Sequence, residues 1–183
     1  MTRTYSWTPW IICLIGTVGR ANPPPHPAAP AINFFDCDVP TGRFSHWNQT
    51  LVSNDAGVSG TLQMMEGRKD SKWLPSASVY LIGLDNAQWV GLKMILFNDD
   101  PDNVGLVVLD SGAKNEHGIL ASIPWAGKAV AFSVRLTSSG EVTVTANGKS
   151  DTVHVPGFRP RKMELVCSTG QFKFADVVIG GQK

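Results

Sequence analysis

The sequence has almost no net charge. Its 16 basic and 15 acidic side chains give a formal charge of +1. Two of the basic residues, Arg3 and Arg20, belong to an expected leader, so the rest of the chain carries 14 basic and 15 acidic residues. Proteins that bind nucleic acid concentrate positive charge on one surface. The balance therefore predicts no nucleic-acid partner.

The sequence also lacks an apolar run long enough for a membrane span. The stretch Trp10–Val18 is apolar, but it is far shorter than the ~20 residues that a spanning helix needs. Arg3 precedes it, and the small residues Gly19 and Ala21 follow it, a pattern typical of an export signal cleaved after Ala21. We therefore expect residues 1–21 to be a signal peptide and the protein to be secreted or periplasmic. An apolar N-terminus on a cytosolic protein is the alternative.

Cysteine is scarce, and its number fits export. Of three cysteines, Cys13 lies in the expected leader, which leaves Cys37 and Cys167. An even count in an oxidising compartment favours a disulfide between them. Two free, buried thiols are the alternative.

No stretch of useful length has apolar residues at helical spacing, and the apolar residues instead alternate with polar ones. Val130, Phe132 and Val134 show the period of two that is typical of a half-buried strand. Asn147-Gly148 is a strong signal for a two-residue hairpin. About ten such short strands, separated by turns, predict an all-β, two-sheet antiparallel β-sandwich or jelly roll. The predicted core includes Val130, Phe132, Val134, Leu136, Val142, Val144, Phe172 and Phe174.

Proline marks the start of the predicted domain. Residues 22–30 contain five prolines, which lack the N–H that a strand ladder needs. We therefore expect a Pro-rich linker over residues 22–31 and one β-sandwich domain over residues 32–183. The nearly continuous apolar runs Ser78–Leu84 and Gln88–Phe97 are typical of central strands that are covered on both faces.

Two segments near the C-terminus carry a resemblance to a known family. Residues 142–148 read V-x-V-x-x-N-G, and residues 172–180 read F-x-F-x-D-V-x-I-G. This strand pair and final strand resemble the concanavalin A-like lectin/glucanase superfamily, in particular its laminin-G-like and legume-lectin-like members. The resemblance covers about a third of the chain and informs fold more than function. It implies a concanavalin A-like jelly roll whose last strand runs beside the N-terminal strand, which agrees with a Cys37–Cys167 disulfide.

Catalytic signatures are lacking. The superfamily includes glycosidases, and retaining glycosidases need two carboxylates about 5 Å apart. An E-x-D-x-E run on a strand supplies such a pair, and the sequence has none; Asp110 and Glu116 form a loose pair at most. A nucleophile elbow, a Cys–His pair and a P-loop are also missing. We therefore expect no catalytic residues, with a glycoside hydrolase using an atypical acidic pair as an alternative.

The segment 98–103 (Asn-Asp-Asp-Pro-Asp-Asn) is rich in oxygen ligands. Many lectins of the resembled superfamily use calcium, for which Asp99, Asp100 and Asp102 are the candidates. Their spacing does not match an EF-hand, and Asn, Asp and Pro are also the preferred turn formers. We expect a plain turn and no metal or cofactor, with calcium at this turn as the alternative.

Tryptophan is the feature that points to a ligand. Sugar rings stack an apolar face on indole, while their hydroxyls need polar groups alongside. Four tryptophans lie outside the expected leader: Trp47, Trp73, Trp89 and Trp125. The residues that we expect at a ligand site are Trp73, Trp89, Asn98, Asp99 and His117. The alternative is that Trp47, Trp89 and Trp125 fill the core.

The sequence thus predicts an exported, non-catalytic β-sandwich that binds a carbohydrate or a glycan-bearing surface. The alternative from another class is a structural or protein-interaction module of the same fold without a sugar site. Asn48-Gln49-Thr50 is a glycosylation sequon, which has meaning only in a eukaryotic protein. The oligomeric state is not predicted.

Overall fold

A computed structural model describes residues 31–51, 56–112 and 118–180. The expected signal peptide, nearly all of the expected linker, Glu116 and His117 lie outside these residues. The described residues form ten strands and no helix, so none of them belongs to a helix that could cross a membrane. The strands are β1 (Ala31–Thr50), β2 (Gly57–Gly67), β3 (Ser76–Gly83), β4 (Trp89–Leu96), β5 (Asn103–Asp110), β6 (Ile119–Pro124), β7 (Val130–Leu136), β8 (Glu141–Ala146), β9 (Lys149–His154) and β10 (Pro160–Ile179).

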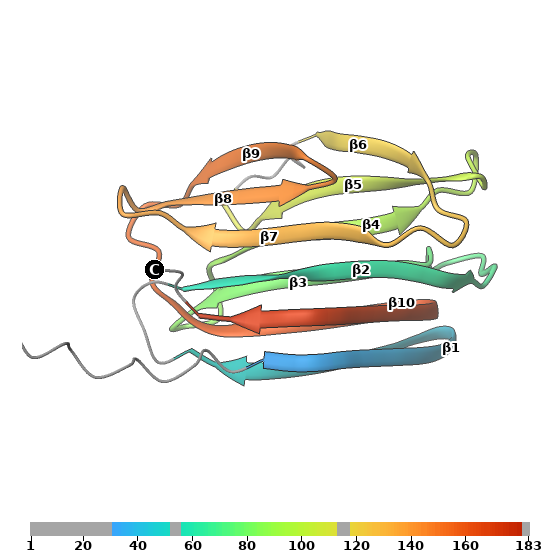
Figure 1. Ribbon diagram of the computed structural model, residues 1–183, viewed down its shortest axis with the longest axis horizontal. Coiled ribbons are helices and arrows are strands. Elements are labelled where there is room, and N and C mark those ends of the chain that lie inside the picture. Colours follow the sequence, from blue (N-terminus) through green and yellow to red (C-terminus); the bar gives the residue numbers. More distant parts are fainter. Residues whose placement is uncertain (1–30, 52–55, 113–117, 181–183) are drawn as a thin grey trace, which may run out of the picture.

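All strand pairs are antiparallel, and the strands form two layers (Figure 1). One layer, which we call the β3 sheet, has the order β6-β5-β4-β3-β10-β1. The other, the β7 sheet, has the order β9-β8-β7-β2-β10-β1. Across the sandwich β3 faces β7, β4 faces β8 and β6 faces β9. The prediction of a two-sheet antiparallel sandwich is confirmed.

The two long strands β1 and β10 belong to both sheets. Residues 160–168 of β10 pair with β3, and residues 170–179 pair with β2. Strand β1 follows the same course, with a register shift between Val39 and Phe44. The backbone of Thr169 turns into the left-handed region between the two halves of β10. At Gly170 a Cβ atom would lie 2.5 Å from the carbonyl oxygen of Glu66, so only glycine fits at this crossing.

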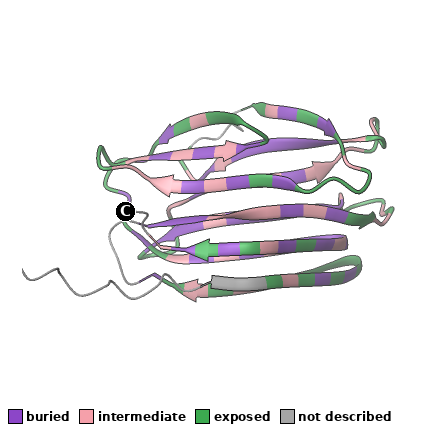
Figure 2. Ribbon diagram, viewed as in Figure 1, coloured by how far each residue is buried: buried purple, intermediate pink, exposed green. Residues whose placement is uncertain are grey.

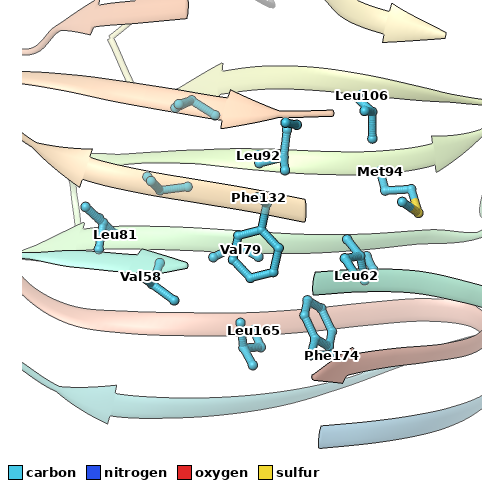
Figure 3. Close-up of a cluster of buried hydrophobic side chains, with 14 of the residues drawn as sticks. Val58, Leu62, Val79, Leu81, Leu92, Met94, Leu106, Phe132, Leu165 and Phe174 are labelled. Carbon is cyan, nitrogen blue, oxygen red and sulfur yellow. The ribbon is translucent and has the colours of Figure 1, made fainter. Parts of the chain in front are cut away.

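The core lies between the two sheets and follows the alternation predicted from the sequence (Figure 2). Phe172, Phe174 and Leu62 are fully buried (Figure 3 labels Phe174 and Leu62). Burying one such side chain contributes about 1.5–3 kcal/mol to stability. Of the eight predicted core residues, seven are buried, while Leu136 is half-buried and packs against the core from the end of β7.

Two further local predictions can be compared with the structure. Asn147 and Gly148 both have positive φ, 50° and 76°, which confirms the tight turn between β8 and β9. Strands β3 and β4 are central in their sheet, but only their inner faces pack in the core. Seven of the eight residues of β3 are nevertheless buried, so β3 is covered on both faces as expected. On the outer face of β4, Lys93 and Ile95 are half-buried and line a groove.

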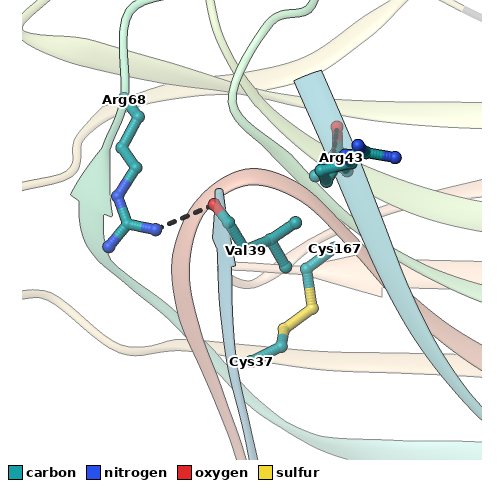
Figure 4. Close-up of a disulfide and its surroundings, with 6 residues drawn as sticks. Cys37, Val39, Arg43, Arg68 and Cys167 are labelled. Carbon is teal, nitrogen blue, oxygen red and sulfur yellow. Dashed lines mark hydrogen bonds between the residues drawn. A yellow bond between two sulfur atoms is a disulfide. The ribbon is translucent and has the colours of Figure 1, made fainter. Parts of the chain in front are cut away.

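Cys37 of β1 and Cys167 of β10 form a disulfide, as predicted (Figure 4). Both side chains are buried, and their Cα atoms are 6.5 Å apart. Cys37 lies in the part of β1 that pairs within the β7 sheet, whereas Cys167 lies in the part of β10 that pairs with β3. The bond therefore joins the two sheets beside the crossing of the long strands, and the alternative of two free thiols is excluded.

Candidate functional site

A groove of about 500 Å³ lies on the outer face of the β3 sheet. Its volume falls within the range of about 300–1,000 Å³ that is usual for small-molecule sites. Strands β3, β4 and β10 form its floor, and β1 and the loop between β2 and β3 contribute its walls. The described residues that line it are Phe44, Lys72, Trp73, Leu74, Ser76, Ser78, Tyr80, Lys93, Ile95, Val166 and Ser168.

The register of the strands brings the floor residues together. Ser76 lies between Ser168 of β10 and Ile95 of β4. Two residues along, Ser78 lies between Val166 and Lys93. The three serines are buried, so their hydroxyl groups lie at the bottom of the groove rather than at its rim. The floor thus alternates small hydroxyl groups with apolar side chains, a combination that suits a ligand with both apolar and hydroxyl-bearing faces.

Two exposed aromatic side chains form part of the walls. Trp73 is 53% exposed and Phe44 is 67% exposed. An Asp70 carboxylate oxygen accepts hydrogen bonds from the backbone N–H groups of Lys72 (2.7 Å) and Trp73 (3.0 Å), which fixes the loop that carries Trp73. Gly42, at a φ of +70°, lies against this loop, because a Cβ atom there would be 3.9 Å from the Trp73 ring. The bend of β1 and the Trp73 loop therefore support each other.

Arg68, at the start of the loop between β2 and β3, also connects this loop to β1. Its guanidinium group forms ion pairs with Asp38 (2.6 Å) and Glu66 (3.1 Å) and donates a hydrogen bond to the carbonyl oxygen of Val39 (2.8 Å; Figure 4). The hydrogen bonds with Glu66 and Asp38 raise the pKa of Arg68 above its ordinary value. Arg68 thereby ties the β2–β3 loop to β1, just before the bend that leads to Phe44.

Tyr80 lies at one end of the groove floor. Burial raises the pKa of its phenol, the nearby charge of Glu164 adds to this, and a hydrogen bond with Ser78 acts in the opposite direction. Tyr80 is therefore protonated at neutral pH and can donate a hydrogen bond. Its ring lies over Gly91, where a Cβ atom would overlap with the ring, and packs edge-on against Trp89 at 5.3 Å between centroids.

The residues predicted for a ligand site do not all come together. Trp73 lines the groove, whereas Trp89 is half-buried, is not among the described lining residues and packs against Tyr80, which is. Asn98 and Asp99 are exposed in the turn between β4 and β5, and Asn98 lines a separate, smaller cavity of about 240 Å³ beside Trp125. His117 lies outside the described residues.

The candidate calcium ligands Asp99, Asp100 and Asp102 lie in this same turn between β4 and β5. The Asp100 carboxylate accepts hydrogen bonds from the Asn103 side chain at 2.9 and 3.2 Å. The indole N–H of Trp125 donates to the Pro101 carbonyl oxygen at 2.9 Å, which fastens the turn to the next loop. Within the described part of the chain, no three His, Cys, Asp or Glu residues are grouped so that they could hold a metal ion.

Trp47 and Trp125 are half-buried and pack against the core, as the core alternative for these residues expects. Trp73, by contrast, projects from a loop over the groove.

Comparisons with known proteins give matches of structure only. No protein-family model and no curated protein matches the sequence. Among solved structures, an alginate lyase from Pseudomonas aeruginosa is 16% identical with a TM-score of 0.53, over 70% of this chain and 65% of the lyase. Scytalido-glutamic peptidase is 13% identical with a TM-score of 0.54, over 75% of this chain and 74% of the peptidase. A CBM2 module of the evolved Dit protein of a Lactobacillus casei phage is 10% identical with a TM-score of 0.50, over 81% and 77%.

The chain has a concanavalin A-like jelly-roll fold. This confirms the fold that the resemblance implied. Because the chain spans less than two thirds of the alginate lyase and identities are low, the likeness concerns the jelly roll and not an activity.

Sequence reasoning missed most of the groove of this jelly roll. Phe44, Tyr80, Lys93 and the floor serines were not singled out. One signal was present: Ser76, Ser78 and Tyr80 alternate with Ala77 and Val79, so β3 has a polar outer face despite its apolar composition.

Proposed function

We propose that this protein is an exported, non-catalytic module that binds a saccharide in the groove of the β3 sheet. The observation that carries the proposal is the Trp73 ring, 53% exposed at the wall of a groove with hydroxyl groups on its floor. A buried indole cannot stack on a ligand, whereas this one offers an apolar face to the groove.

The chemistry of the lining matches that of a sugar. The apolar C–H face of a pyranose ring stacks on Trp73 or Phe44. The hydroxyl groups of the sugar form hydrogen bonds with the serines of the groove floor, Ser76, Ser78 and Ser168, and accept a hydrogen bond from the Tyr80 phenol. The alginate lyase with this fold acts, by its name, on a saccharide, which agrees with the proposal.

The ionisable side chains of the described groove lining favour ligand binding over catalysis. None of the described residues that line the groove carries a carboxylate, so the acid pair of a glycosidase has no counterpart among them. The raised pKa of Tyr80 keeps its phenol protonated, which suits a hydrogen-bond donor and not a general base at neutral pH.

Export is supported by two independent features. Residues 1–21 have the pattern of a cleaved signal, and the Cys37–Cys167 disulfide is of a kind that persists in oxidising compartments. A glycan encountered outside the cytoplasm is therefore the expected ligand.

The test is a glycan array, followed by calorimetric titration of the best-bound oligosaccharide. Trp73→Ala should weaken binding about ten- to a hundredfold, since losing one stacking partner costs about 1–3 kcal/mol, the range known for bases on aromatic side chains. The melting temperature should barely change because Trp73 projects from a loop.

Phe34→Ala is the matched control, because Phe34 is an exposed aromatic residue outside the groove lining. It should leave affinity unchanged. Failure of every saccharide to bind, or equal affinities for the wild type and Trp73→Ala, would reject the proposal.

One observation favours a second candidate, a protein-interaction module. Among the described strands, β1 pairs with β10 alone, so none of them covers the other side of this 20-residue strand, which carries the exposed Phe34 and Phe44. Such an edge can accept an added strand from a peptide. This candidate gains if Trp73→Ala has no effect and an extended peptide protects the β1 amides from hydrogen exchange.

A further inference from the structure

We infer that the cavity of about 240 Å³ beside Trp125 is a second binding site, which takes a neutral aromatic ring with one polar substituent. The inference goes beyond the proposed function, because the described linings of this cavity and of the groove share no residue. The volume lies just below the range of about 300–1,000 Å³ that drug-sized ligands occupy, so it suits a ligand with a single ring.

The cavity lies at one end of the sandwich, where β2, β4 and β6 all end (Figure 1). Gly67 is the last residue of β2, Leu96 is the last residue of β4, and Trp125 directly follows β6. A Cβ atom at Gly67 would lie 2.7 Å from the Leu96 side chain, so the two sheets approach each other closely here. Because Leu96 also packs against the core, the cavity lies at the edge of the core.

Apolar side chains make up most of the described lining. They are Pro75, Leu96, Phe97, Pro101 and Trp125. Phe97 and Trp125 are half-buried, so both rings keep part of their surface uncovered. An aromatic ligand that packs on these rings gains more than the burial of its apolar area alone, because the charge distributions of two aromatic rings attract each other in edge-on and offset arrangements.

Contacts within the protein hold the two rings in place. The indole N–H of Trp125 donates to the Pro101 carbonyl oxygen at 2.9 Å, and its backbone N–H donates to the Asp102 carbonyl oxygen at 3.4 Å. Phe97 lies over Gly105, where a Cβ atom would be 2.5 Å from the Phe97 ring. The cavity is therefore preformed, as small-molecule sites usually are. Since the indole N–H is already used, Trp125 offers a ligand its ring rather than a hydrogen bond.

The polar side chains at the rim argue against a sugar in this cavity. Lys69 and Asn98 are exposed, whereas Pro75 and Leu96 lie deeper. A sugar carries hydroxyl groups around its whole ring, and those that face the deeper apolar side chains would lose water without gaining a partner, which costs free energy. An aromatic ring avoids this cost when its one polar substituent points to the rim. There the Asn98 amide can both donate to the substituent and accept from it.

Charges of both signs around the cavity favour a neutral ligand. The lining contains Lys69 and Arg68, and the Arg68 guanidinium group is paired with Asp38 and Glu66. The adjoining turn 98–103 carries three aspartates. A cationic ligand would therefore be repelled by the Lys69 ammonium group, and an anionic ligand by the carboxylates of the turn. A neutral amide or hydroxyl substituent meets neither repulsion.

The experiment is a titration of the isotope-labelled full chain, followed by the NMR signals of the tryptophan indole N–H groups. The probes are benzamide, benzoate, cyclohexanecarboxamide and methyl galactopyranoside. Benzoate adds a charge to the same ring, and cyclohexanecarboxamide keeps the polar group but removes the aromatic character. We expect benzamide to shift the Trp125 signal with a dissociation constant of about 1 mM, ordinary for a ligand of this size.

The other probes define the class of ligand. Cyclohexanecarboxamide should bind about two- to tenfold more weakly than benzamide, the range expected from the loss of one aromatic pair. Benzoate should also bind more weakly than benzamide, and methyl galactopyranoside should leave the Trp125 signal unchanged.

The variants locate the site. Trp125→Leu keeps an apolar side chain but removes the ring, and it should weaken benzamide binding about two- to tenfold. Trp47→Leu is the matched control, because Trp47 is also half-buried against the core but is not among the described lining residues; it should leave the affinity unchanged. If Trp125→Leu does not fold, Phe97→Leu removes the other ring. Asn98→Ala, in an exposed turn, should weaken benzamide binding several-fold through the loss of one hydrogen bond.

The outcomes separate this site from the groove. Weakening of benzamide by Trp125→Leu but not by Trp73→Ala supports the inference, whatever the glycan array shows. Loss of benzamide binding in Trp73→Ala would place the aromatic ring in the groove and overturn the inference. Absence of any benzamide shift at Trp125, or equal affinities for benzamide and cyclohexanecarboxamide, would also overturn it. Tighter binding of benzoate than of benzamide would refute a neutral ligand, and a shift of the Trp125 signal by methyl galactopyranoside alone would make the cavity a sugar subsite instead.

Discussion

At the scale of single residues, Tyr80 connects the groove to the packing around it. Burial raises its pKa above the ordinary value of 10.0, so folding favours the protonated phenol. This contribution to stability is fully present below pH 10 and is lost as the pH rises through the higher pKa of the folded state. The absorbance of tyrosinate, taken as the difference between the wild type and Tyr80→Phe, should therefore appear at higher pH than in free tyrosine.

Ser78 provides the control for this titration. Its hydrogen bond lowers the pKa of Tyr80, so Ser78→Ala should move the ionisation of Tyr80 to still higher pH. Ionisation of Tyr80 at or below pH 10 would mean that the phenol is hydrated and that it does not belong to the buried floor. A bound saccharide that accepts from the phenol should raise the pKa further.

At the scale of elements, the loop between β2 and β3 decides where Trp73 lies. Asp70→Ala removes the acceptor for two backbone N–H groups, those of Lys72 and Trp73. Removal of a side-chain cap of this kind costs about 0.5–2 kcal/mol. We expect saccharide affinity to fall several-fold and the melting temperature to fall by about 1–8 °C, without loss of the fold, since the loop lies outside the core.

Asp85 allows a matched comparison. Its carboxylate accepts the Ala87 N–H (3.0 Å) in the turn between β3 and β4, outside the groove lining. Asp85→Ala should therefore leave affinity unchanged, and Asp70→Asn, which keeps an acceptor, should restore most of it. Equal affinities of Asp70→Ala and the wild type would show that the Trp73 loop needs no such support.

The strands and turns could be predicted from the sequence because their signals are local, whereas the groove could not. Alternation along Val130, Phe132 and Val134 and the Asn147-Gly148 turn are local signals, and the structure confirms the strands and hairpin that they indicate. The groove is not local: Ser76 meets Ser168 only because the middle of the chain pairs with its end. Sheet order is set by the packing of distant strands, and period two does not encode it. Arg68 illustrates this, because it follows β2, whereas its partner Asp38 is distant in the sequence and lies on β1.

At the scale of the whole molecule, β1 and β10 hold the two sheets together, and the Cys37–Cys167 bond secures them. The bond links residues 130 positions apart, so its loss frees a long loop in the unfolded chain. Replacing both cysteines with alanine should lower the free energy of unfolding by about 2–5 kcal/mol. Chemical denaturation of the double variant and the wild type measures this difference.

The stability lost with the Cys37–Cys167 disulfide should not be distributed evenly over the two sheets. Strand β10 keeps partners on both sides in each sheet, whereas β1 has β10 as its one partner among the strands that the structure describes. Without the disulfide, β1 should therefore open at lower free energy than the rest, and its amides should exchange with solvent faster than those of β3, β7 and β10. Because β1 carries Phe44, the same opening should weaken saccharide binding before the sandwich unfolds. Equal acceleration of exchange in β1 and β7 would instead show that the two sheets unfold as one unit, with the disulfide acting only on the unfolded chain.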